Sequence, residues 1–277
     1  MGREAIFDAE HFFDGMLSNS DYAIEAIRSA YSAGARWIVL CDTNGGSLPR
    51  EIEKAVSLAI KAGVPGTHLG IHTHNDTDNA VANTLIAVDA GVRQIQGTLN
   101  GLGERCGNAN LTALIPTLAL KSDYCDRFET GISRTALKGM TRLSRRLDDI
   151  LNRVPMRQAS YVGASAFAHK SGLHANAILK DPSTYEHVDP ELVGNERIIP
   201  MSNQAGGSNL KKRLSDAGID QNLNKDELEE VKVMKIQKVR DEVEEEEYFK
   251  EQLDEVEVEV NREKEEKVKS EFIIHIV

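Results

Sequence analysis

Two histidines separated by a single residue are the clearest candidates for chemistry in this sequence. His72 and His74 end an apolar run that begins at residue 69, and Asn75 and Asp76 follow them. Side chains two residues apart lie on the same face of a β-strand, so both imidazole rings are expected to point the same way. Two imidazoles that converge at the end of a strand suit a divalent metal ion. The alternative interpretation is a pair of polar side chains that line the mouth of a barrel.

A glycine-rich segment provides the second candidate. Residues 97–110 (GTLNGLGERCGNAN) contain four glycines and connect an apolar run to a helical pattern. Glycine allows sharp backbone bends that other residues resist. Because the segment leads into a helix, its backbone N–H groups could bind an anion. An ordinary glycine-rich turn is the alternative.

Four apolar runs, each followed by turn residues and a helical pattern, are expected to position these candidates. The predicted strands are residues 5–9, 37–42, 69–74 and 94–99, and the predicted helices are residues 21–33, 49–62, 77–90 and 109–120. Asp14 and Gly15 are assigned to the turn before the first helix. Gly34, Gly63 and Gly91 follow the first three helices, where a left-handed cap requires glycine. The spacing of the strands matches a β/α unit.

Repeated β/α units with polar residues at the ends of the strands leave two folds open. One is a (β/α)8 barrel, which needs eight units, of which the pattern contains only four. The other is a small doubly wound sheet of the flavodoxin type. Periodicity alone therefore predicts an α/β fold that is either half a barrel or a flavodoxin-like sheet.

The pattern changes after the fourth unit. Residues 134–153 read as one basic amphipathic helix with Leu137, Met140, Leu143, Leu147 and Ile150 on one face. A region of short helices and turns follows, and the chain then becomes acidic and low in complexity, with a helical pattern at 241–254 and a strand-like alternation at 255–260. The predicted domains are residues 1–125, 126–222 and 223–277.

Composition excludes several classes of protein. The net charge is −11, and residues 223–277 carry 19 acidic against 10 basic side chains, so no basic face for nucleic acid is expected. No apolar run reaches the roughly 18 residues of a membrane span. The N-terminus lacks the pattern of a secretory signal. Three cysteines without CxxC spacing argue against a disulfide framework and favour the cytoplasm.

Five ordered blocks together resemble the family of citramalate, 2-isopropylmalate and homocitrate synthases. They are residues 8–15 (DAEHFFDG), 72–76 (HTHND), 100–111 (NGLGERCGNANL), 169–178 (HKSGLHANAI) and 181–186 (DPSTYE). The resemblance covers residues 2–220, about four fifths of the chain. The first block is most similar to the citramalate synthase branch.

The resemblance implies a partial TIM (β/α)8 barrel, formed by strands 5–8, that is followed by a small, mostly helical subdomain and an acidic C-terminal tail. It also implies one divalent cation (Mg, Mn or Zn) bound by His72, His74 and Asn108. The metal would polarise a 2-oxo acid while a base removes a proton from acetyl-CoA, the co-substrate. The implied reaction is the conversion of pyruvate to citramalate in branched-chain amino-acid biosynthesis, including the route to isoleucine.

Three further residues receive catalytic roles from the resemblance. Glu10 matches the family's active-site glutamate. His174 and Tyr185 match a catalytic pair that reaches into the barrel of the neighbouring subunit of a homodimer. Cys106 could instead indicate a carbon–carbon lyase of the HMG-CoA type, although the residues around it follow the synthases. Arg105 is expected to brace its loop.

One motif of the family has no counterpart in this sequence. The Asp-Thr-Thr-Leu-Arg-Asp-Gly type segment, which supplies an arginine and a metal-binding aspartate, does not occur. We therefore expect a fragment that is inactive without a complementing N-terminal half-barrel. The alternatives are a decayed fragment or a non-catalytic interaction module that pairs with a partner chain, and the HMG-CoA lyase type of enzyme.

Overall fold

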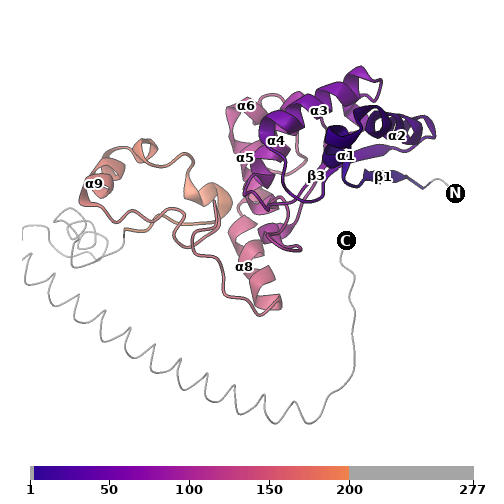
Figure 1. Ribbon diagram of the computed structural model, residues 1–277. Helices are drawn as coiled ribbons and strands as arrows, with labels where there is room; N and C mark the ends of the chain where they lie inside the picture. Colours follow the sequence, from indigo (N-terminus) through magenta and orange to yellow (C-terminus); the bar gives the residue numbers. More distant parts are fainter. Residues whose placement is uncertain (1–2, 200–277) are drawn as a thin grey trace, which may run out of the picture. The chain divides into compact units, whose positions relative to one another are not determined.

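The computed structural model describes residues 3–199, which belong to two compact units (Figure 1). Residues 3–168 together with Glu186–Ile198 form the first unit, and His169–Tyr185 belong to the second. Each unit is described by itself. The acidic tail predicted at 223–277, with its expected helix and strand, lies outside the described residues.

The first unit alternates strands and helices, as the periodicity predicts. Its elements, in chain order, are β1 (Ile6–Ala9), α1 (Phe12–Ser18), α2 (Ser20–Ser32), β2 (Trp37–Asp42), α3 (Pro49–Lys61), η1 (Gly66–His68), β3 (Leu69–Thr73), α4 (Ala80–Ala90), β4 (Gln94–Gln96), η2 (Leu99–Gly101), α5 (Leu111–Leu120), α6 (Ser122–Cys125), α7 (Arg134–Leu137), α8 (Met140–Ile150) and η4 (Pro190–Val193). The three glycines expected after the first helices all adopt positive φ, between 96° and 125°.

The helix α1 is a departure from the sequence prediction. Asp14 and Gly15, assigned to a turn, lie inside this helix. Phe12 and Phe13 at its start are 3% and 5% exposed and pack edge to face, with their ring centroids 5.4 Å apart. Burial of two aromatic rings contributes several kcal/mol, which outweighs the roughly 1 kcal/mol cost of glycine in a helix.

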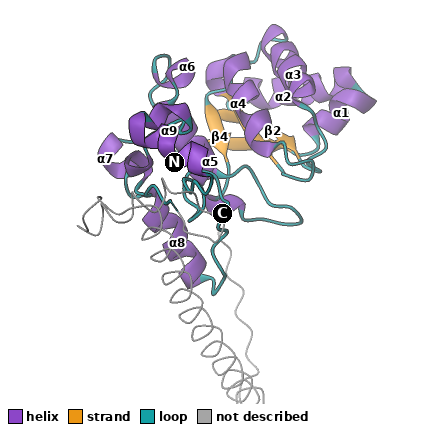
Figure 2. Ribbon diagram, turned by 90° about the vertical axis from the view of Figure 1, so that its left-hand side faces the viewer, coloured by secondary structure: helices purple, strands orange, loops and turns teal. Residues whose placement is uncertain are grey.

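The strand order differs from that of a flavodoxin-like sheet, one of the two folds that the sequence left open. All pairings are parallel, and the order is β1-β2-β3-β4, the same as along the chain. In a flavodoxin-like sheet the strand order reverses at a switch point. When each strand instead lies beside the one before it, always on the same side, right-handed crossovers place every helix on one face of the sheet. The sheet is therefore singly wound, with helices α1 to α4 packed around its strands (Figures 1 and 2).

The sheet is also strongly curled. The Gln96 side chain at the end of β4 reaches Asp8 on β1, with 3.3 Å between Nε2 and Oδ1, although β2 and β3 lie between them. In a flat sheet these strands would lie roughly 14 Å apart, three times the usual strand spacing, which is too far for these two side chains to meet. The face opposite the helices is therefore concave.

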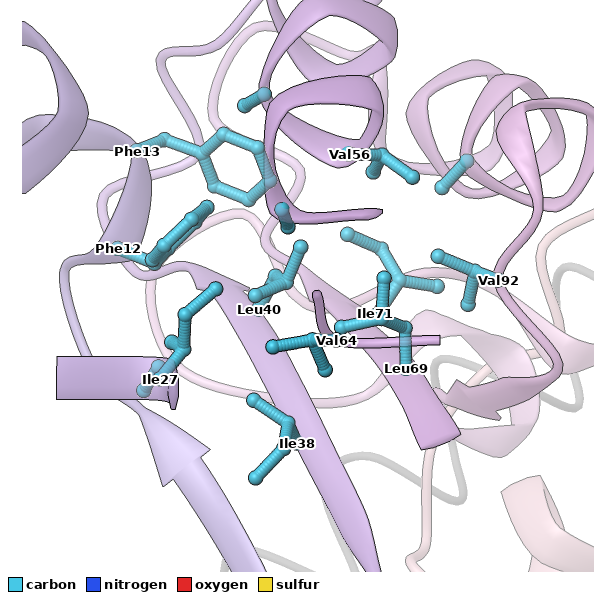
Figure 3. Close-up of a cluster of buried hydrophobic side chains, with 14 of the residues drawn as sticks. Phe12, Phe13, Ile27, Ile38, Leu40, Val56, Val64, Leu69, Ile71 and Val92 are labelled. Carbon is cyan, nitrogen blue, oxygen red and sulfur yellow. The ribbon is translucent and has the colours of Figure 1, made fainter. Parts of the chain in front are cut away.

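The hydrophobic core lies between the sheet and its helices. Ile38 and Leu40 on β2, and Leu69 and Ile71 on β3, are 0% exposed and pack against side chains such as Val56 of α3 (Figure 3). These strand residues alternate with residues that face the concave side, so the pleat separates an apolar outer face from an inner face that carries polar groups.

Two features of residues 134–153 differ from the predicted single helix. The helix is interrupted at Lys138 and Gly139, where α7 ends and α8 begins. Leu137 and Met140 are buried as predicted, but Leu143 and Ile150 are 46% and 66% exposed. The buried face of α8 is instead polar, for a reason given below.

The second unit contains α9 (Gly172–Lys180) and the short helix η3 (Pro182–Thr184). The Asp181 side chain accepts a hydrogen bond from the backbone N–H of Ser183 at 2.9 Å, which caps η3 and fixes the turn after α9. Within the described part of the chain, no helix has the length and apolar character needed to cross a bilayer.

Candidate metal centre

The imidazole rings of His72, on β3, and of His74, directly after β3, converge, as their spacing predicts. Leu69 and Ile71 on this strand face the helices, so His72 and His74 project from the opposite, concave side. The Nε2 atoms of the two histidines lie 3.3 Å apart, and their ring centroids lie 5.1 Å apart. Two imidazole nitrogens on one tetrahedral cation, each at about 2.1 Å, would be about 3.4 Å apart. The observed spacing therefore fits a shared cation.

The environment of His74 favours its neutral form. Burial lowers the pKa of His74, and His72 and Arg105 lower it further, against the opposing charges of Asp76 and Glu10. A neutral imidazole is the form that binds metal. The Nδ1 atom of His74 is buried and has no hydrogen-bond partner among the described residues.

Asn108 is held opposite His74 by the backbone. The two residues form an isolated antiparallel bridge, which joins the glycine-rich loop to the end of β3. The Asn108 Nδ2 group donates to the carbonyl of Leu102 at 2.9 Å. Its Oδ1 atom is buried and accepts no hydrogen bond from the described residues. A buried acceptor without a partner costs free energy, and an amide oxygen is a suitable ligand for a hard cation. The residues present therefore fit a divalent metal.

The tautomer of His72 is fixed by neighbouring side chains. The Asp8 carboxylate can only accept, so the Gln96 amide must turn its Nε2 group toward Asp8 and its Oε1 atom toward His72. The His72 Nδ1–H then donates to Gln96 Oε1, over 2.9 Å. The remaining nitrogen, Nε2, then carries a lone pair and can accept from His74 Nε2, which lies 3.3 Å away. Such outer partners orient metal-binding histidines in proteins.

Glu10 lies on the same rim, in the turn after β1. Its Oε2 atom accepts a hydrogen bond from the Thr43 hydroxyl at 2.7 Å, and the same hydroxyl accepts from the backbone N–H of His11. Thr43 follows β2, so the ends of two neighbouring strands are tied together through this carboxylate. The hydrogen bond holds one oxygen of the Glu10 carboxylate beside Thr43.

Arg105 braces the glycine-rich loop, as predicted. Its guanidinium makes two hydrogen bonds to Asp76, of 2.8 and 3.0 Å, and a third to the carbonyl of Thr43 at 2.8 Å. The bond from Arg105 holds the pKa of the Asp76 carboxyl below its usual range. The loop is thereby fastened across the ends of β2 and β3.

The chemistry of the three cysteines gives a first prediction. Cys41 is 2% exposed, and burial, together with the charges of Glu10 and Asp8, raises the pKa of its thiol to about 12. Cys106 and Cys125 are free and exposed. Because the thiolate is the reactive form, iodoacetamide at pH 8 should modify the two exposed thiols of the native protein and reach Cys41 only after unfolding. Peptide mass spectrometry would detect this, and rapid native labelling of Cys41 would contradict it.

His174 and Tyr185 are brought together within the second unit. His174 lies on α9 and Tyr185 directly follows η3. Their rings stack with centroids 4.1 Å apart and an interplanar angle of 29°. Eleven positions separate the two residues in the sequence, so the turn after α9 creates the pair. An imidazole and a phenol in contact can exchange or hold a proton.

Sequence reasoning missed the residues that support the site. Within residues 3–199, no three or more His, Cys, Asp and Glu side chains lie where they could together hold a metal ion. The candidate centre has only two such side chains, the imidazoles of His72 and His74, and its third ligand would be the carboxamide of Asn108. Gln96 was within reach of sequence analysis, because it is paired in register with His72 on the adjacent strand. The bonds of Thr43 and Arg105 join separate loops and leave no local pattern.

Two protein families match the chain in succession. The HMGL-like family matches residues 9–143, and the homocitrate synthase post-HMGL domain-like family matches residues 161–244. The first match contains Glu10, His72, His74 and Asn108, and the second contains both His174 and Tyr185.

Curated relatives are similar over the same region. An (R)-citramalate synthase of Aquifex aeolicus is 51% identical over 217 residues, and one of Synechocystis sp. is 49% identical over 224 residues. These matches cover 78% and 79% of this chain and 40% of each relative. A 2-isopropylmalate synthase of Methylacidiphilum infernorum is 34% identical over 228 residues, which cover 81% of this chain and 44% of that protein. The chain thus spans about 40% of the length of the first two relatives.

Proposed function

Because this chain belongs to the family of citramalate, 2-isopropylmalate and homocitrate synthases, we propose that it supplies part of the active site of an acyltransferase that condenses acetyl-CoA with a 2-oxo acid. The proposed 2-oxo acid is pyruvate, which gives citramalate for branched-chain amino-acid biosynthesis, because the 51% and 49% identical relatives are citramalate synthases. The observation that carries the proposal is the close approach of His72 and His74, together with an Asn108 that is bridged to His74 through the backbone and has a buried, unpartnered Oδ1.

These three residues would bind one divalent cation, which is Mg, Mn or Zn. When bound, the cation would act as a Lewis acid toward the oxygens of the 2-oxo acid. The chain itself supplies the fixed tautomer of His72, through Gln96, and the neutral form of His74, through burial. It also presents the carboxamide oxygen of Asn108 with its N–H₂ group already bound to Leu102.

Glu10, His174 and Tyr185 are the proposed catalytic groups. Thr43 orients the Glu10 carboxylate on the rim that carries the imidazoles. His174 and Tyr185 form a stacked pair that could hold or transfer a proton. In the proposed homodimer this pair acts at the barrel of the neighbouring subunit.

The four strands are proposed to be strands 5–8 of a (β/α)8 barrel. The consecutive order and the curl of the sheet support this, because both are required for closure. Ile6 and Phe7 of the edge strand β1 are 51% and 36% exposed, as expected for a strand that a further strand covers. A complementing N-terminal half-barrel is the proposed partner. The proposed divisions of the chain remain 1–125, 126–222 and 223–277.

A substitution at Gln96 gives a second prediction. Gln96→Leu removes the acceptor of the His72 Nδ1–H bond and leaves that ring free to rotate or change tautomer. Loss of such an outer partner lowers metal affinity by roughly 10–100-fold, and we expect Mn²⁺ affinity, measured by calorimetry, to fall in this range. The double substitution Gln96→Glu with Asp8→Asn, which keeps an acceptor for His72 and a donor–acceptor pair between positions 96 and 8, should lower that affinity less. Equal Mn²⁺ affinities for Gln96→Leu and the wild type would contradict the supporting role.

Complementation tests the proposed reaction. The chain would be mixed with the separately produced N-terminal part of the Aquifex aeolicus relative, and release of the coenzyme A thiol from acetyl-CoA would be followed with pyruvate present. The expected result is pyruvate-dependent release by the mixture that neither part shows alone. His74→Ala should abolish it.

Two outcomes would count against the proposal. One is a mixture that forms a complex on gel filtration but releases no thiol with pyruvate, 2-oxoisovalerate or 2-oxoglutarate. The other is release that His74→Ala leaves unchanged. Cleavage of HMG-CoA by the complex, sensitive to Cys106→Ala, would indicate the lyase instead.

A further inference from the structure

The buried face of helix α8 is polar, which is unusual for a helix that packs on a domain. Ser144 and Asp148 are 5% and 8% exposed, while Leu143 and Ile150 on the same helix are 46% and 66% exposed. Met140 is the one buried apolar side chain of α8, and Thr141 is buried as well. Apolar burial alone therefore does not account for the side on which this helix packs. Its contact is made by specific hydrogen bonds.

Thr141 donates to the Val193 carbonyl at 2.8 Å, whereas Ser144 and Asp148 both bond to Asn100, in the glycine-rich loop. The Asn100 Nδ2 group donates to the Ser144 carbonyl and to Asp148 Oδ1, each at 3.0 Å. The Ser144 hydroxyl donates to Asn100 Oδ1 at 2.7 Å. The carboxamide thus uses both of its N–H groups and its oxygen on one helix. Its backbone has φ 57°, a left-handed conformation that asparagine tolerates better than most residues.

The two residues after Asn100 hold Asn108. The Gly101 carbonyl accepts from the backbone N–H of Asn108 at 3.2 Å, and the Leu102 carbonyl accepts from its side-chain Nδ2 group at 2.9 Å. These bonds use the backbone N–H and one side-chain N–H of Asn108, and Oδ1 accepts no hydrogen bond from the described residues. The direction of that oxygen therefore depends on the backbone at positions 100–102, which α8 holds through Asn100 and which Thr98 also holds through its bonds with Gly101 and Leu102.

We propose that Ser144 and Asp148 of α8 act through Asn100 as positioning residues, which aim the Asn108 carboxamide oxygen at a divalent cation. This inference rests on the proposed metal site and adds to it a supporting element outside the strands and their loops. It also explains why α8 turns a polar face inward, since buried polar networks that are fully satisfied fix one arrangement of their partners.

Two substitutions separate the side chain of Asn100 from the shape of its backbone. Asn100→Gly retains the left-handed conformation, because glycine adopts positive φ freely, but removes all three bonds to α8. Asp148→Leu removes one acceptor from the other side, and Asp148→Asn restores an acceptor oxygen in nearly the same shape. Asp149→Leu, at the exposed neighbouring position, is the matched control.

The measurement is calorimetric titration of Mn²⁺ into the full chain and each variant. Circular dichroism of the metal-free proteins at the same temperature would establish that each variant is folded. We expect Asn100→Gly and Asp148→Leu to lower Mn²⁺ affinity by roughly 10–100-fold, as for the loss of other outer partners of metal ligands. Asp148→Asn and Asp149→Leu should stay within about 3-fold of the wild type, well below that range.

His74→Ala, titrated in parallel, distinguishes a failure of the proposed role of α8 from a failure of the proposed metal site. If the wild type binds Mn²⁺, His74→Ala loses it, and folded Asn100→Gly binds as the wild type does, the role of α8 is overturned and the metal site stands. A loss in Asp149→Leu equal to that in Asp148→Leu would also overturn it. A wild-type chain that binds no Mn²⁺, or binds it equally after His74→Ala, overturns the metal site and this inference together.

Discussion

Replacement of His74 by alanine is expected to remove divalent-metal binding from this protein. His74 Nε2 lies 3.3 Å from His72 Nε2, and burial lowers the pKa of the His74 ring, which favours the metal-binding form. Loss of an outer partner of a metal ligand costs roughly 10–100-fold in affinity, so loss of a ligand itself should cost more than 100-fold. Calorimetric titration with Mn²⁺ at constant pH measures this directly.

His68 offers a matched control on the same segment. It lies just before the opposite end of β3, where its Nδ1 atom is 2.9 Å from the Arg36 carbonyl, in the same stretch of chain as His74 but away from the rim. His68→Asn places an amide nitrogen near the position of Nδ1 and should leave Mn²⁺ affinity unchanged. Equal effects of the two substitutions would show that the histidines act through general stability and not as ligands.

Truncation of Ile71 is expected to have the largest effect on folding. Ile71 is 0% exposed, lies between the sheet and its helices, and packs in the main core (Figure 3). An Ile→Ala change in such a position loses the transfer free energy of the removed methyl groups and leaves a cavity. The expected loss is about 3–4 kcal/mol in the free energy of unfolding, measured by urea denaturation of the full chain.

Ile6→Ala makes the same chemical change on the same sheet. Ile6 is 51% exposed on the edge strand β1, so its truncation should cost well under about 1 kcal/mol, the scale of surface substitutions. A loss below about 1 kcal/mol for Ile71→Ala would contradict the placement of Ile71 in the core.

The periodicity of the sequence was sufficient to predict the alternation of strands and helices. Buried parallel strands are continuous apolar runs, and Trp37–Asp42 matches its predicted bounds. Two predictions from the sequence were wrong for the same reason, because tertiary contacts outweighed the local sequence pattern. Burial of Phe12 and Phe13 stabilises a helix that includes Gly15. The hydrogen bonds of Asn100 and of Thr141 hold α8 in an orientation that its apolar residues do not predict.

The candidate site divides in a similar way. Strand alternation predicts that His72 and His74 converge, whereas Asn108 was selected only by resemblance to the synthase family. The supporting contacts were not predictable, since the bond between Asn100 and Asp148 spans 48 positions and that between Gln96 and Asp8 spans 88. Such contacts arise from the curl of the sheet and the packing of α8, which no short sequence window contains.

The X-ray absorption spectrum of the Mn²⁺-loaded chain tests the central claim most directly. Two imidazole nitrogens and a carboxamide oxygen around one ion predict a first shell that contains two histidine nitrogens, with oxygens in the other positions. His74→Ala should reduce the imidazole contribution from two rings to one in any ion that still binds. A shell of oxygens alone in the wild-type protein would contradict the metal centre at His72 and His74.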